Sequence, residues 1–155
     1  MVIITGNPVD AFVLQRQSGG IPLRSGVVTD GAVTSVTLTF LPGPAVDFGS
    51  LADGRYTLTA LAGQIAAGGH SLDGNGDGTP GDNYTFGDAQ GLFRMFGDVN
   101  GDQVVNGLDL GFFRNAFGTA AGDANYLSYL DFDNNGVING LDLGQFRTRF
   151  GTMLP

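Results

Sequence analysis

The same spacing of oxygen-bearing side chains occurs twice in the last third of the chain, beginning at Asp98 and again at Asp131. In both copies Asp or Asn fills positions one, three, five, nine and twelve of a twelve-residue loop. A hard cation such as calcium takes six to eight oxygen ligands, and a loop of EF-hand type supplies them from these positions and from the backbone carbonyl of position seven. The repeat therefore predicts two calcium-binding loops in this part of the chain.

The predicted ligands are side-chain oxygens, apart from one backbone carbonyl in each loop. The first loop offers Asp98, Asn100, Asp102, the Val104 carbonyl, Asn106 and Asp109. The second loop offers Asp131, Asp133, Asn135, the Val137 carbonyl, Asn139 and Asp142. The chain contains no Glu, so Asp takes the closing position that a bidentate Glu usually fills. Calcium is the predicted cofactor, with two ions in these loops.

A short helix is expected after each loop, because apolar residues recur there at i, i+3 and i+7. The two stripes are Leu110, Phe113, Phe117 and Leu143, Phe146, Phe150. Gly118 and Gly151 are expected to end the helices, and the stripes to form the core between them. The apolar segment 126–130 favours a short helix entering the second loop.

Residues 1 to about 88 alternate between apolar and polar side chains with period two, which is typical of half-buried strands. Strands are expected near residues 2–5, 10–16, 21–28, 32–41, 54–61 and 83–87, with 92–96 as a continuation. The Asp30-Gly31 dipeptide predicts a tight hairpin. Short strands at this spacing favour an antiparallel β-sandwich. The predicted fold class is therefore mixed, with a sandwich domain at 1–91 followed by a small helical calcium module at 92–155.

Composition restricts the partners of the chain. Acidic residues outnumber basic ones by 15 to 7, and the formal charge is -8, so nucleic acid is not an expected partner. There is no cysteine, which excludes disulfides and thiolate metal sites. No apolar run approaches the ~20 residues that a membrane-spanning helix needs. The opening residues also lack the pattern of an export signal.

The two loops and their helices resemble the type I dockerin family over about residues 97 to 155. The resemblance rests on Gly97-Asp98-Val99-Asn100-Gly101-Asp102, on Asp131-Phe132-Asp133-Asn134-Asn135-Gly136, and on the gapless match of the helices that follow. Dockerins are non-catalytic bacterial modules that bind cohesin modules in a calcium-dependent way. They are often attached to extracellular polysaccharide-degrading enzymes and surface proteins. The resemblance implies an extracellular or cell-surface location and a cohesin-like or cell-envelope protein partner.

Carried over to this chain, the resemblance pairs the two loops through Val105 and Ile138, at position eight, and places the partner surface on the two helices. The implied partner-binding residues are Leu108, Arg114, Asn115, Leu141, Arg147 and Thr148. Two features depart from the family pattern. Loop positions ten and eleven carry Gly-Leu in both copies where Ser or Thr hydroxyls are usual, and the sixth residue of the first loop is Gln103 rather than Gly. Because of the first departure the partner need not be an ordinary cohesin, and the second indicates a weaker first site or an ordinary substitution.

The N-terminal region resembles the immunoglobulin-like sandwich that precedes such repeats in some large bacterial surface proteins. This resemblance rests on the run Leu51-Ala52-Asp53-Gly54-Arg55-Tyr56-Thr57-Leu58 and on the segment 72–86. It implies adhesion or spacing rather than chemistry.

A third candidate site lies in the Gly- and Asp-rich segment that starts at residue 73. Its ligands would be Asp73, Asn75, Asp77 and Asp82. No helix is expected after it and position twelve falls on Tyr84, so an ordinary loop is the alternative interpretation. The single histidine, His70, is adjacent to Ser71, but no strained turn or oxyanion hole accompanies them, which favours a surface histidine over a hydrolytic triad.

We therefore expect a non-catalytic protein that attaches a parent polypeptide to a scaffold or cell surface through calcium-dependent docking, in a polysaccharide-degrading setting. The alternative hypothesis is a calcium-rigidified terminus of a surface or adhesion protein without a cohesin partner. A small module without disulfides buries little apolar surface, so calcium is expected to act as a folding cofactor.

Overall fold

The computed structural model describes residues 2–16, 19–30 and 33–154, and the chain forms two compact units. One unit contains Met1–Ala45 and Arg55–Phe93, and the other contains Val46–Gly54 and Arg94–Pro155. The short segment 46–54 thus belongs with the C-terminal residues, and no sequence signal indicated this interleaving. The division into functional domains at 1–91 and 92–155 stays a prediction.

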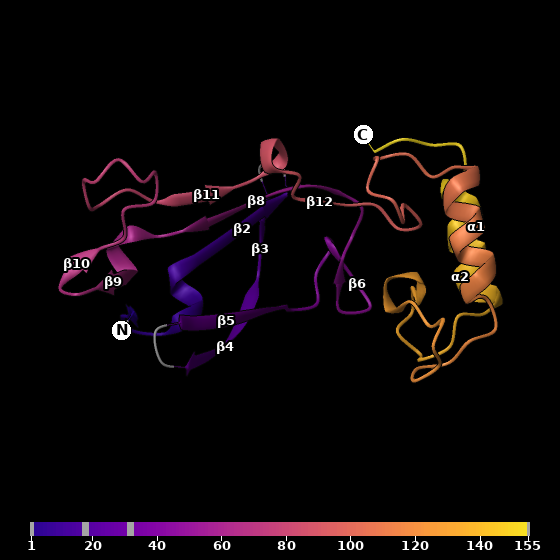
Figure 1. Ribbon diagram of the computed structural model, residues 1–155, viewed down its shortest axis with the longest axis horizontal. Coiled ribbons are helices and arrows are strands. Elements are labelled where there is room, and N and C mark those ends of the chain that lie inside the picture. Colours follow the sequence, from indigo (N-terminus) through magenta and orange to yellow (C-terminus); the bar gives the residue numbers. More distant parts are fainter. Residues whose placement is uncertain (1, 17–18, 31–32, 155) are drawn as a thin grey trace. The chain divides into compact units, whose positions relative to one another are not determined.

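The N-terminal unit is built from short strands that pair antiparallel (Figure 1). They are β1 (Val2–Ile4), β2 (Phe12–Arg16), β3 (Gly19–Ile21), β4 (Leu23–Asp30), β5 (Val33–Phe40), β8 (Gly54–Ala60), β9 (Ile65–Ala67), β10 (His70–Ser71), β11 (Tyr84–Phe86) and β12 (Phe93–Arg94). The main sheet has the order β11-β8-β2-β3, and β12 also pairs with β8. Two further sheets have the orders β1-β9-β10 and β4-β5. Single 3-10 turns occur at η1 (Pro8–Ala11), η2 (Ala62–Gln64) and η3 (Asp88–Gln90).

The period-two pattern of the sequence predicted which side chains of these strands point inward. In β2, Leu14 is buried while Val13 and Gln15 are exposed, and β5 alternates between exposed and half-buried residues along its whole length. The core of the unit consists of Ala11, Leu14, Ile21, Tyr56, Ala60 and Ala62. The mixed fold class and the antiparallel strands are confirmed. The immunoglobulin-like arrangement stays a prediction.

The predicted hairpin at Asp30-Gly31 falls partly outside the described residues, because Gly31 is not among them. The strands that flank it, β4 and β5, pair in register from Leu23 with Phe40 to Asp30 with Val33.

The C-terminal unit contains a small hairpin and two helices. Its elements are β6 (Val46–Asp47), β7 (Ser50–Leu51), α1 (Gly107–Ala116), η4 (Ser128–Leu130) and α2 (Gly140–Arg149). Between β6 and β7, Phe48 and Gly49 both have positive φ angles, 48° and 84°, the backbone of a tight hairpin whose twist matches its strands. The entering helix expected at 126–130 is only the 3-10 turn η4. None of the helices within the described residues combines the length and apolar character that crossing a membrane requires.

The two helices lie side by side (Figure 1) and meet through Phe113 and Phe146, whose ring centroids are 4.8 Å apart. Both rings are fully buried. The sequence predicted that the whole apolar stripe of each helix would form the core, and this was wrong at the last position. Phe117 and Phe150 follow the helices as extended C-cap residues and are 47% and 46% exposed. Gly118 and Gly151 come next with φ angles of 85° and 79°, the left-handed geometry expected after a helix end.

The predicted pairing of the two loops through Val105 and Ile138 was also wrong. Both residues are fully buried, but each loop bonds to the chain that follows the other copy's helix. The Val105 carbonyl accepts the Gly151 N–H (2.7 Å), and the Ile138 carbonyl accepts the Gly118 N–H (2.8 Å). Each loop therefore hydrogen-bonds to the segment that follows the helix of the other copy, and these bonds hold the two repeats together.

The backbone at Gly97 leaves no room for a side chain. A Cβ added there lies 2.9 Å from the Phe146 ring and 3.3 Å from Val105, whereas a Cβ at Gly118 meets nothing within 4 Å. Both glycines have positive φ angles, so alanine is strained in both places, but only Gly97→Ala also overpacks the core. We expect Gly97→Ala to lower the free energy of unfolding by about 1–3 kcal/mol more than Gly118→Ala. Urea unfolding of both variants measures the difference, and equal losses would contradict the described packing.

Candidate metal centres

The first C-terminal loop is held in a tight turn by the carboxylate of its first residue. Asp98 accepts the N–H groups of Gly101 (2.8 Å), Asp102 (3.2 Å) and Gln103 (2.8 Å). Asn100 and Asp102 are tied to each other by an amide-to-carboxylate bond of 2.9 Å. Gln103 adopts a φ angle of 67°, so a non-glycine residue occupies the left-handed conformation that this position requires.

The second loop repeats this geometry and gathers its carboxylates more closely. Asp131 accepts the N–H groups of Asn135 (3.1 Å) and Gly136 (2.8 Å). Carboxylate oxygens of Asp131, Asp133 and Asp142 all lie within 4.8 Å of one another. Within the described residues, Asp98, Asp102 and Asp109 do not form such a group. Three carboxylates at this separation repel one another, and a divalent cation offsets that repulsion.

The last ligand position of each loop is a fully buried aspartate, Asp109 or Asp142. Asp109 accepts the N–H groups of Val99 and Asn106, both at 2.8 Å. Asp142 accepts those of Phe132 (2.7 Å) and Asn139 (2.8 Å). Each carboxylate therefore joins the second and ninth residues of its loop, and it also sits in the first turn of the following helix.

The ninth residues have a second role that sequence reasoning missed. The side chains of Asn106 and Asn139 accept the N–H groups of Leu108 and Leu141, both at 2.8 Å, and so cap α1 and α2. Together with Asp109 and Asp142 they form capping boxes. The spacing Asn-x-x-Asp, a variant of the capping box, is the sequence signal from which these helix caps could have been predicted. The Asn139 amide also donates to the Val137 carbonyl at 3.2 Å, so two predicted ligands of the second loop contact each other.

Hydrogen bonding favours the ionised form of the second loop's first residue. Burial raises the pKa of Asp131, but hydrogen bonds from Tyr126, Gly136 and Asn135 outweigh it, and the net shift is downward. The Tyr126 hydroxyl donates to Asp131 at 2.6 Å, and this bond is the main cause that raises the pKa of Tyr126 to about 12. Tyr126 was missed by sequence reasoning, which assigned it to an apolar helix. The Asp131 carboxylate is thus ionised at neutral pH.

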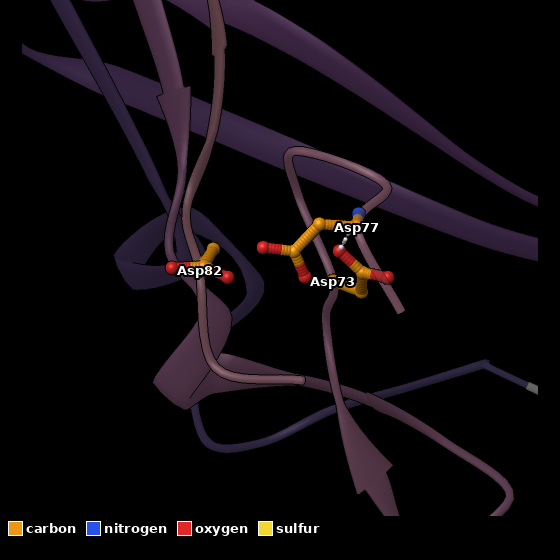
Figure 2. Close-up of side chains that lie close together, drawn as sticks. All are labelled: Asp73, Asp77 and Asp82. Carbon is orange, nitrogen blue, oxygen red and sulfur yellow. Dashed lines mark hydrogen bonds between the residues drawn. The ribbon is translucent and has the colours of Figure 1, made fainter. Parts of the chain in front are cut away.

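The third candidate loop brings three of its four predicted ligands together. Figure 2 shows the carboxylates of Asp73, Asp77 and Asp82 near one another, and their oxygens lie within 4.8 Å. Asp82 reaches this place because its backbone pairs with Asp73 in an isolated parallel bridge. The Gly74 N–H donates to the Asp82 carbonyl at 3.0 Å. A Cβ at Gly74 would lie 2.3 Å from the backbone of Asn83, so only glycine permits this close approach.

The turn of the third loop matches that of the first C-terminal loop bond for bond. Asp73 accepts the N–H groups three, four and five residues further on, at 2.8, 3.2 and 2.8 Å. The corresponding distances from Asp98 are 2.8, 3.2 and 2.8 Å. The fourth predicted ligand, Asn75, donates to Asp77 at 3.1 Å. Hydrogen bonds from the Thr79 backbone and from Asn75 lower the pKa of Asp77.

The implied partner residues lie on exposed parts of the helices. Leu108 and Leu141 are 66% and 67% exposed, and Arg114, Asn115, Arg147 and Thr148 are exposed too. Arg114 and Arg147 also line a groove of about 520 Å³ between the helices, whose other walls are apolar. His70 and Ser71 are both exposed in the two-residue strand β10, so His70 is a surface residue.

Sequence reasoning missed one further cluster, which involves segment 46–54. Asp53 forms ion pairs with Arg149 and Arg94, and Arg149 stacks against Phe96 and Phe132. Asp53 and Arg149 are 96 positions apart, and no repeat or motif connected them.

Residues 96–149 match the family model of the dockerin type I domain. No curated protein matches the chain significantly. A solved structure described as a type II cohesin-dockerin domain from Bacteroides cellolosolvens is 32% identical, covering 40% of this chain and 93% of its own, with a TM-score of 0.34. Two mutants of a type II cohesin-X-dockerin complex from Acetivibrio cellulolyticus are each 17% identical. The N-terminal interface mutant covers 93% of this chain and 83% of its own, with a TM-score of 0.36. The C-terminal interface mutant covers 99% and 91%, with a TM-score of 0.38.

TM-scores this low do not establish a shared fold for the whole chain, so the assignment rests on the family match and on the loop geometry. The matched segment contains both loops and both helices, with each loop closed by a buried aspartate. Residues 96–149 of this chain are a dockerin type I domain, a calcium-binding module of protein-protein interaction.

Proposed function

We propose that this chain is a calcium-dependent docking protein whose two helices bind a cohesin-like partner. The observation that carries the proposal is the pair of buried carboxylates, Asp109 and Asp142. Each one closes a loop through backbone N–H groups and lies in the first turn of a helix. A cation bound at these carboxylates fixes the loop and the helix start together, so the docking surface depends on the metal.

Each C-terminal loop would hold one calcium ion. The proposed ligands are those expected from the sequence: Asp98, Asn100, Asp102, Val104, Asn106, Asp109, and Asp131, Asp133, Asn135, Val137, Asn139, Asp142. The donor set fits calcium, because it consists of carboxylate, amide and carbonyl oxygens. Asn106 and Asn139 cap the helices with their side-chain oxygens, which supports coordination through water at position nine. The ion supplies charge neutralisation and structural order.

The loop at residues 73–82 is proposed as a third calcium site. Its support is the convergence of Asp73, Asp77 and Asp82 and the match of its turn to that of the first C-terminal loop. It would stabilise the N-terminal unit and lies outside the dockerin segment.

The partner surface is proposed around Leu108, Arg114, Asn115, Leu141, Arg147 and Thr148. Exposed apolar side chains that repeat on two helices mark an interaction surface more than a solvated one. The Gly-Leu pairs at loop positions ten and eleven replace hydroxyls with leucine, which favours an apolar partner face. Function outside the cell, in the attachment of polysaccharide-degrading proteins, is proposed from family membership, and no catalytic role is proposed for the chain.

The second candidate function is a calcium-rigidified terminus of a surface or adhesion protein. It is favoured by the absence of Ser or Thr at loop positions ten and eleven. The two functions can be separated by a binding measurement, because only the docking function requires that the chain bind a cohesin-like partner.

Calcium should stabilise the C-terminal unit through both loops. At a free concentration 100 times the dissociation constant, one site adds about 2.7 kcal/mol to the free energy of unfolding. We expect calcium to raise the melting temperature and the helical circular dichroism of the chain. The Asp142→Asn variant should lose the part of the calcium-dependent stabilisation that comes from one site. The control Asp123→Asn, which removes an exposed charge outside the loops, should be stabilised by calcium as much as the unaltered chain. Helicity and melting temperature that do not respond to calcium or chelator would refute the metal sites.

The third loop can be tested by counting ions. Isothermal titration calorimetry with calcium should give three ions per chain for the unaltered protein and two for Asp77→Asn, which removes the central carboxylate. Asp10→Asn, an exposed aspartate of the same unit, serves as the control and should bind three. A count of two in all three proteins would leave segment 73–82 as an ordinary loop.

The docking surface can be tested with a double variant. Leu108→Asp combined with Leu141→Asp places charges on both exposed leucines, and it should weaken binding to recombinant type I or type II cohesin modules by more than tenfold, about 1.4 kcal/mol or more. Ile3→Asp, at an exposed residue of β1, should have no effect. Surface plasmon resonance with calcium and with chelator measures the binding. If no cohesin binds the unaltered chain while calcium still stabilises it, the rigidified-terminus function is supported instead.

A further inference from the structure

One acidic side chain of segment 46–54, that of Asp53, contacts the rest of the C-terminal unit. The Asp53 carboxylate forms an ion pair with Arg149 at the end of α2 and lies 3.7 Å from the Arg94 guanidinium. It also accepts the backbone N–H of Phe96 at 2.7 Å. The side chains of Asp53, Arg149 and Arg94 are 25%, 18% and 23% exposed. Partly buried, multiply bonded ion pairs hold their geometry better than exposed ones.

The guanidinium of Arg149 is held over aromatic rings. Its central carbon lies 5.3 Å from the centroid of Phe132 and 5.4 Å from that of Phe96. Phe132 also meets Phe96 edge-on at 5.0 Å and Phe48 edge-on at 5.6 Å. Segment 46–54 therefore acts on the ring of Phe132 in two ways. Phe48 contacts the ring directly, and Asp53 holds Arg149, which lies over the ring.

Phe132 is the second residue of the second calcium loop. Its backbone N–H donates to Asp142 at 2.7 Å, and Asp142 is the buried carboxylate that closes the loop. A contact that holds Phe132 in place therefore also holds one of the two backbone N–H groups that donate to Asp142. A continuous series of contacts thus runs from Asp53 through Arg149 and Phe132 to Asp142.

The first loop has no counterpart to this arrangement. The residues 33 positions earlier than Phe132 and Arg149 are Val99 and Ala116, which have neither an aromatic ring nor a charge. The two repeats are alike in their ligands and differ at the two positions that segment 46–54 contacts. The asymmetry indicates that this segment acts on one loop only.

We propose that Asp53 is a positioning residue for the second calcium site, and that segment 46–54 raises the calcium affinity of that site relative to the first. The inference rests on the proposed calcium sites. By linkage the effect is reciprocal: calcium in the second loop strengthens the attachment of segment 46–54, which connects on both sides to the N-terminal unit. Orienting groups behind a metal ligand commonly control affinity in this way.

The test uses the full chain with Asp77→Asn as the parent, so that calcium uptake comes from the C-terminal loops alone. Asp98→Asn is then added to weaken the first site, or Asp131→Asn to weaken the second. Asp53→Asn should lower the affinity of the remaining site by about five- to tenfold in the Asp98→Asn background and by less than twofold in the Asp131→Asn background. Isothermal titration calorimetry with calcium chloride measures both constants.

Asp47→Asn is the matched control, because Asp47 lies in the same segment and its side chain forms no ion pair within the described residues. It removes the same charge and should change either constant by less than twofold. Phe48→Ala is a second variant that keeps the ion pair. Phe48 is 60% exposed, so its loss is mild for folding, and it should weaken the second site in the same direction as Asp53→Asn.

The outcomes separate this inference from the proposed function. A parent protein that takes up no calcium refutes the calcium sites themselves. If the parent binds calcium but Asp53→Asn matches Asp47→Asn, or weakens both sites equally, the positioning role is overturned. If Asp53→Asn fails to fold by circular dichroism, Phe48→Ala decides the question, and an unchanged second site in that variant overturns the inference.

Discussion

Two buried aspartates organise the dockerin segment. Asp109 and Asp142 are inaccessible to solvent, and each accepts N–H groups from the second and ninth residues of its loop. A buried carboxylate is costly unless hydrogen bonds or a cation compensate its charge. Backbone N–H groups supply the hydrogen bonds to both carboxylates. The other oxygen-bearing residues of each loop are the ligands proposed for a cation. Loop closure and the helix start therefore depend on the same two side chains, which are also proposed metal ligands.

Much of this arrangement could be predicted from the sequence, because it is local. The twelve-residue spacing indicates where the two loops lie, and the short helices that follow are indicated by apolar residues at i, i+3 and i+7. The strands β2, β5 and β8 follow from period-two alternation in the same way, whereas β9 and β10 were not predicted. In each case neighbouring residues in the chain determine one another's positions.

The errors concern contacts between distant parts of the chain. Periodicity indicates which face of a helix is apolar, but whether Phe117 is covered depends on where the chain goes after the helix. Likewise, position eight of each loop was expected to pair with its counterpart, whereas the backbone partners come from beyond the opposite helix. Asp53 and Arg149 carry no pattern that connects them. Their contact follows from the placement of segment 46–54, which only the tertiary structure shows.

The crossed backbone bonds make the two repeats depend on each other. Val105 bonds to Gly151 and Ile138 bonds to Gly118, so each repeat satisfies the polar groups of the other. One loop and one helix standing alone would lack these hydrogen-bond partners. The tandem repeat is thus the smallest unit in which these backbone groups are paired.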